Sequence, residues 1–162
     1  MAGSSCAACR AGNWDLAIGP LRVRTLPMSL EAALCAHWAA TPALNALLPV
    51  EKLTTGLVRG ASTPCAALVP KACRAALITN TPEQWEEASF AFLVWHESYD
   101  AALAIADALR AAFHRATLQI SPQARALRIM EKSRSARQHA DGLWLIRIDF
   151  EALVHRTASP PP

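Results

Sequence analysis

Strict alternation near the C-terminus constrains the fold of this chain more than any other feature of its sequence. From Leu143 to Val154, apolar and polar side chains largely take turns, and Arg147 and Asp149 lie between apolar neighbours. Alternation of this kind places one face of a β-strand on a core and leaves the other largely in water. It is typical of antiparallel sheets. The apolar side consists of Trp144, Ile146, Ile148, Phe150, Ala152 and Val154.

The preceding residues predict helices and further strands. Ser29 and Ser98 each stand before an apolar pattern of helical spacing and are expected to cap helices. A further helical turn is expected after Thr41-Pro42. Strands are expected at 63–70, 71–79 and 87–95 and again around Leu127 and Ile129, whereas the polar segment 131–142 is expected to be a loop. This order predicts an α+β fold: a mostly antiparallel sheet of about four or five strands with helices packed on one face.

Both ends of the chain differ from its centre. Residues 1–27 show little periodicity and contain Pro20 and Pro27, so we expect a poorly ordered extension upstream of a natural start at Met28. Residues 28–156 fit one domain of ordinary size. Three consecutive prolines close the sequence, and residues 157–162 are expected to be a disordered tail.

Composition excludes several classes of protein. With 52% hydrophobic and 18% charged residues, the body of the chain is not intrinsically disordered. No apolar run approaches the roughly 20 residues of a membrane span, so we expect a soluble protein without a membrane partner. The net charge of +3 is too small for a dedicated nucleic-acid binder. One basic segment, Arg125–Arg137, is either a solvated hairpin tip or an arm that contacts phosphates.

The five cysteines do not indicate a cofactor or metal site. Cys6 and Cys9 form a lone C-x-x-C without the second pair that a tetrahedral zinc site needs. The odd number and irregular spacing of the five cysteines do not fit a disulfide framework. We therefore expect reduced thiols, no metal and no cofactor.

No catalytic motif is present, and we expect a protein that is not an enzyme. His96-Glu97 stands between a strand and a helix, either as an acid–base pair or as a connector before the capping Ser98; the connector is favoured. An unrecognised enzyme using His96, Glu97 and His114 remains an alternative. Three tryptophans, at positions 85, 95 and 144, suggest a stacking platform for single strands, although core positions are favoured.

The strand–helix joint "FAFLVWHESYDAALAIADALRAAF" carries a family resemblance. Together with the earlier helix "SLEAALCAHWAATPALNALL" and the closing strand "GLWLIRIDFEALV", it resembles the phage tail-terminator or tail-completion proteins. The resemblance spans roughly 28–156 as an ordered pattern of elements. It departs from the family at the bland "CAALVP", where members usually have a well-formed strand rich in β-branched or aromatic residues.

The resemblance implies a structural protein of a virion tail or phage-like particle, assembled in the bacterial cytoplasm. Members form rings, commonly hexamers, that stop growth of the tail tube and join it to the head. The implied partners are further copies of the chain, the tail tube protein and a head-connector protein, with DNA passing through the lumen. A small nucleic-acid-associated module using Arg125–Arg137 remains the alternative.

Two surfaces are expected to serve such a ring. Small residues on the non-core side of the second long helix would let a neighbouring subunit approach, although alanine is also simply the best helix former. These residues are Ala101, Ala104, Ala108 and Ala111. Basic residues of the 131–142 segment would face DNA in the lumen, namely Lys132, Arg134 and Arg137.

Overall fold

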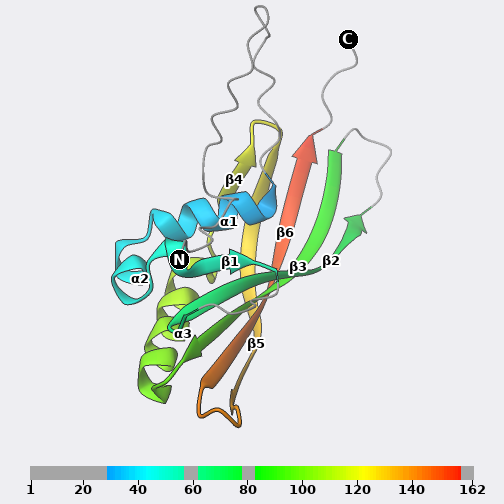
Figure 1. Cartoon of the computed structure of the whole chain (residues 1–162). Helices are drawn as coiled ribbons and strands as arrows, with labels where there is room; N and C mark the ends of the chain where they lie inside the picture. Colours follow the sequence, from blue (N-terminus) through cyan, green and yellow to red (C-terminus); the bar gives the residue numbers. More distant parts are fainter. Residues whose placement is uncertain (1–28, 57–61, 78–82, 158–162) are drawn as a thin grey trace, which may run out of the picture.

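One curled sheet with helices on a single side forms the molecule (Figure 1). The computed structural model describes residues 29–56, 62–77 and 83–157. The expectation of a poorly ordered segment 1–27 therefore lies outside the described residues. The final strand runs on to Thr157, and the rest of the expected tail also lies outside them.

The elements follow one another as short helices, strands, a long helix and three more strands. The helical elements are α1 (Leu30–Ala39), α2 (Pro42–Leu47), the 3-10 turn η1 (Val50–Lys52) and α3 (Tyr99–Phe113). The strands are β1 (Leu53–Thr55), β2 (Cys65–Leu77), β3 (Glu83–His96), β4 (Leu118–Ser121), β5 (Ala124–Gln138) and β6 (Trp144–Thr157). Across the sheet their order is β1-β2-β3-β6-β5-β4.

The structure fits the α+β class, but the expected number of four or five strands is wrong and the sheet is not antiparallel throughout. The described sheet has six strands, and it is mixed because β1 runs parallel to β2 while the remaining pairs are antiparallel. The two missed strands, β1 and β4, have only three and four residues. Strands this short show too few alternations to be recognised from periodicity.

The two strands expected at 63–70 and 71–79 are a single strand, β2. In the structure the register with β3 shifts between Pro70 and Ala72, and β1 pairs with β2 only as far as Leu68. Proline is accommodated at such irregularities and on sheet edges because its missing N–H then costs no regular ladder bond.

The loop expected over 131–142 is also wrong, since β5 continues to Gln138. Its residues pair with β6 as far as Trp144, and the turn is confined to the residues between. Polar side chains hid this strand because neither of its faces is fully covered at this end; most of its residues from Lys132 onward are exposed. Pairing with a neighbour, and not hydrophobic alternation, holds this part of β5 in place.

The helix starts are confirmed in position. Ser29 Oγ accepts from Ala32 N at 3.2 Å, and Ser98 Oγ accepts from Ala101 N at 3.4 Å. Thr41 stands at the start of α2 but does not cap it, because its hydroxyl donates to His37 O at 2.8 Å. None of the described helices is long and apolar enough to cross a membrane.

An aromatic cluster joins the helices to one face of the sheet. Phe92 of β3 is fully buried and lies 5.5 Å, ring centre to ring centre, from Trp38 of α1 and 5.0 Å from Phe113 of α3. Phe90, also on β3, and Phe150 of the neighbouring β6 complete the cluster. Both long helices therefore pack on the same face, and the opposite face carries no described helix.

We predict that Phe92→Ala lowers the free energy of unfolding by about 3–5 kcal/mol, because it leaves a cavity where both helices meet the sheet. Urea denaturation followed by circular dichroism measures the change. The control is Leu47→Ala, whose side chain is 46% exposed and whose loss should change stability by less than about 0.5 kcal/mol. Equal losses for the two variants would contradict this description of the core.

Candidate assembly surfaces

The strand–helix joint is a structural connector. His96 ends β3, and its Nδ1 accepts a hydrogen bond from Ser98 N at 2.9 Å, which fixes the turn before α3. Glu97 Oε1 accepts from Thr63 Oγ1 at 3.3 Å. Next to the joint, the ring of Tyr99 packs 4.8 Å from that of Trp144. Each of these contacts orders the chain locally, and none aims His96 and Glu97 at a common point.

The residues of the enzyme alternative do not converge. His96 precedes α3 and His114 follows it, and a helix of 15 residues is about 22 Å long. His114 is occupied elsewhere, since its Nδ1 accepts from Glu131 N at 3.1 Å. Within 29–56, 62–77 and 83–157, no group of three or more histidine, cysteine or carboxylate side chains is placed to hold a metal ion.

The tryptophans do not form one platform. Trp85 packs on His155 at 4.6 Å, and Trp144 packs on Tyr99. By register, Trp85 and Trp95 lie on the helix-free face and Trp144 lies on the other. All three are half-buried.

The alanine stripe of α3 is divided in the structure. Ala104 and Ala111 are exposed, whereas Ala101 is half-buried and Ala108 packs against the core. The exposed pair lies on a helix surface that also carries Asp107 and Arg110. A neighbouring subunit would therefore meet small side chains between charged ones.

Arg134 is held within the subunit. Its Nη1 lies 2.6 Å from Asp107 Oδ1 of α3, and its Nε lies 3.3 Å from Glu131 Oε1. Glu131 in turn lies 3.2 Å from Arg110 Nε. This ion-pair network ties α3 to β5, and removing Arg134 would leave Glu131 partly buried with weaker compensation.

The other two residues expected in the lumen are more accessible. Lys132 pairs with Glu151 at 3.0 Å but keeps a side chain that is 55% exposed. Arg137 is exposed near the end of β5. The register places Arg137 opposite Leu145, so it stands on the face of the sheet without helices.

That helix-free face carries an excess of basic residues. Asp149 is its most connected carboxylate: it accepts from Lys71 Nζ at 2.5 Å, from Ser133 Oγ at 2.7 Å and from Arg147 Nε at 3.1 Å. By register and ion pairing, the basic residues of this face are Lys71, Arg74, Arg125, Arg128, Lys132, Arg137 and Arg147. The acidic residues are Glu83, Glu87, Asp149 and Glu151.

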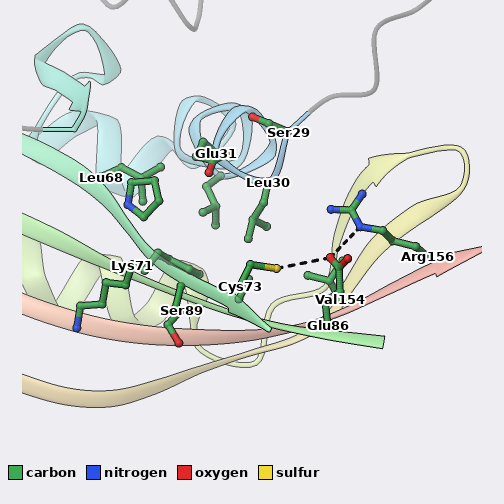
Figure 2. A pocket seen from close by; sticks show the side chains of 15 residues that line it. Ser29, Leu30, Glu31, Leu68, Lys71, Cys73, Glu86, Ser89, Val154 and Arg156 are labelled. Carbon is green, nitrogen blue, oxygen red and sulfur yellow. Dashed lines mark hydrogen bonds and ion pairs between the residues drawn. The ribbon is translucent and has the colours of Figure 1, made fainter. Parts of the chain in front are cut away.

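A pocket of about 330 Å³ lies on the opposite face, between the start of α1 and strands β2, β3 and β6. Figure 2 shows Leu30 pointing into it and Glu86 at its rim, where Glu86 Oε2 accepts from Cys73 Sγ at 3.7 Å and from Arg156 Nε at 2.9 Å. Partial burial, and then the nearby Glu86 carboxylate, raise the pKa of the Cys73 thiol. Because the thiolate is the reactive form, a raised pKa makes Cys73 a poor nucleophile, and the pocket does not resemble a thiol active site.

Sequence reasoning did not find this pocket or the Asp149 cluster. Lys71 and Asp149 are far apart in the sequence and meet only because β2, β3 and β6 are neighbours. The alternation in "WLIRIDF" did place Arg147 and Asp149 on one face, which was the available signal.

We predict that Asp149 contributes stability that depends on pH. Burial opposes its charge, but the hydrogen bonds from Lys71, Ser133 and Arg147 outweigh burial and lower the pKa of Asp149. A lowered folded-state pKa gives stability that is complete above the unfolded value of about 3.9 and is lost as the pH falls through the folded value. Wild type should therefore lose more stability between about pH 5 and 3 than Asp149→Asn, by on the order of 1 kcal/mol.

Urea denaturation at a series of pH values measures this difference. Glu151→Gln is the control, because Glu151 has one exposed lysine partner, and such pairs contribute about 0–1 kcal/mol. Parallel pH profiles for wild type and Asp149→Asn would show that the cluster does not stabilise the fold.

Comparison with known proteins agrees with this geometry. The model of the family described as "Tail completion protein gp17" matches residues 32–155. No curated protein sequence is significantly similar to the chain.

Among solved structures, a chain from the virion of a native gene transfer agent (GTA) particle superposes with a TM-score of 0.63 at 20% identity, covering 78% of this chain and 95% of its own length. A second solved chain is looser, with a TM-score of 0.44 and 15% identity over 82% of this chain and 98% of its own length. The first likeness supports the fold. The family match spans nearly all of the described residues, and this chain therefore belongs to the tail completion protein gp17 family, a family of structural proteins of the phage tail.

Proposed function

We propose that the protein forms a ring of six subunits that caps the tail tube of a phage or phage-like particle and joins it to the head. The family match over residues 32–155 carries this proposal. The likeness in fold to a chain of a gene transfer agent virion supports it. The partners in this role are further copies of the chain, the tube protein and a head-connector protein.

A docking role fits the distribution of chemistry over the surface. The titratable groups of the described residues stand mostly in ion pairs on the sheet and α3, and His96 and His114 lie at opposite ends of one helix. A catalytic site needs such groups to converge on one substrate. The protein is accordingly proposed to act by binding, without bond chemistry, in a particle assembled in the bacterial cytoplasm.

In the ring, the helix-free face of the sheet would look toward the lumen. Its basic excess suits the passage of DNA, because lysine and arginine side chains near phosphates release condensed counterions. Lys132 and Arg137 are the accessible lumen candidates at one end of this face, and Arg134 serves chiefly to hold α3. The helices would then lie outside, where Ala104 and Ala111 can contact a neighbour.

We predict that a single carboxylate on the exposed alanines of α3 weakens ring formation. Ala104→Glu or Ala111→Glu would bury an unpaired charge between subunits, which interfaces tolerate poorly. Analytical ultracentrifugation, alone and with purified tail tubes, should show a ring of about 100 kDa for wild type if six subunits close, and smaller species for the variants.

Ala36→Glu is the matched control, because Ala36 is an exposed alanine on α1. It should assemble like wild type. Unchanged rings in both α3 variants would exclude the alanine surface from the interface. Absence of a ring both in solution and on tails would contradict the proposed function itself.

We also predict that charge reversal at the lumen end lowers DNA retention. Lys132→Glu/Arg137→Glu should reduce the fraction of particles that keep their DNA, more strongly at low salt, because exposed charges are screened by salt. Nuclease protection of DNA in purified particles measures it. DNA binding by the free subunit separates the alternatives: a nucleic-acid module using Arg125–Arg137 should shift on DNA as a monomer and lose that shift in Arg125→Glu, whereas residues of a lumen act only in the assembled particle.

A further inference from the structure

Two strands of the sheet have long edges that no other described strand covers. β1 pairs with β2 only up to Leu68, and the following residues 69–77 have no strand beside them on that side. β4 pairs only with the first residues of β5, and residues 132–138 of β5 have no strand beside them on that side. An open edge presents unpaired backbone N–H and C=O groups and is a template for pairing with another chain.

The open part of β2 lacks most of the features that usually protect a free sheet edge. All of its residues from Pro70 to Leu77 are exposed, and most of them are small or apolar. Leu77 itself is 57% exposed. Proteins usually blunt free edges with charge or proline, and here Pro70 and Lys71 stand only at the inner end. The outer part, residues 72–77, retains a single charge, Arg74, which Glu87 neutralises at 2.7 Å.

We propose that β2 of one subunit pairs, through residues 71–77, with residues 132–138 of β5 in the next subunit, so that the sheet continues around the ring. This inference rests on the ring of the proposed function and names its interface. β2 and β5 run in opposite directions within the sheet, so subunits related by the ring axis bring them together antiparallel. The contact is head-to-tail, as a closed ring requires.

The positions of the two edges match the stagger of a closed sheet. Positions along β6 serve as the common scale. Cys73, at the middle of the open edge of β2, pairs with Ala88 and through it lies level with Ala152 of β6. Ala136, on the open edge of β5, pairs with Ile146 of β6. The two edges are thus offset by six residues of β6, or about 20 Å, over a width of four strands, or about 19 Å. Strands joined in this way tilt by about 45° from the ring axis, close to the 35–45° found when sheets close.

The charged side chains favour this register over the one shifted toward Ala75. Residues directly opposite one another point to the same face of a sheet, and both Cys73 and Ala136 lie on the face of the helices. Pairing Cys73 with Ala136 places Arg137 opposite Ala72 and Arg74 opposite Ser135. Shifting by two residues to place Ala75 opposite Ala136 would bring Arg74 against Arg137, and like charges directly opposite are destabilising.

Cysteine cross-linking tests the pairing. All test proteins carry Cys6→Ser and Cys9→Ser and retain the exposed Cys73; Cys35 and Cys65 are buried. Ala136→Cys should give a ladder of covalent dimers and larger species on non-reducing gels after oxidation. The reaction is run at alkaline pH because the pKa of the Cys73 thiol is raised. Ser135→Cys is the matched control: it is the adjacent residue on the opposite face, and its yield should be at least several-fold lower.

Charge exchange provides the second measurement. Ala72→Arg should weaken the ring at low salt by facing Arg137 of the neighbour, and the added Arg137→Glu should restore it. Rings that form without selective cross-linking and without an effect of Ala72→Arg would overturn the pairing and leave the proposed function standing. No ring in solution or on tails would reject the proposed function and this interface together.

Discussion

Pairing of β3 with β6 is the interaction on which the rest of the structure depends. Their register runs without interruption over fourteen residues of each strand, whereas β2 and β5 each contain shifts against them. Because the alternation is unbroken, Phe90, Phe92 and Phe150 stand on one face, and α1 and α3 pack there through Trp38 and Phe113. A shift of one residue would turn these rings toward solvent and remove the site on which both helices pack.

Sequence reasoning succeeded where hydrophobic periodicity is strong and failed where pairing alone orders the chain. The alternation of β6, the capping serines and the core side of α3 were visible because burial of one face imposes a period. The outer half of β5 shows no such period, because it has a strand neighbour on one side only and its side chains remain in water. β1 and β4 are too short for an alternation to show, and the register shift after Pro70 interrupts the alternation of β2.

The candidate site follows the same division. The alanines of α3 and the basic residues of β5 are candidates proposed from sequence, and the ion pairing of Arg134 could not be foreseen because packing of α3 on β5 brings Asp107 to it. An arginine held by two carboxylates contributes little free positive charge. Arg137, three residues further along β5, lies on the helix-free face, where its charge is exposed. Within the basic segment Arg125–Arg137, ion pairs formed on folding therefore separate Arg134, which stabilises the fold, from Arg137, whose charge is accessible to partners.

The outer part of β2 is the least buried part of the sheet's long strands and the one with most to gain from an added strand. Beyond Val69 both faces of β2 are exposed, so this part gains little from hydrophobic burial and is held chiefly by its ladder to β3. An isolated exposed ladder is marginal in water, and a third strand adds cross-strand contacts and backbone hydrogen bonds. A neighbouring subunit would supply that strand. In the proposed ring this pairing would stabilise residues 70–77, so the stability of the outer part of β2 would depend on assembly of the ring.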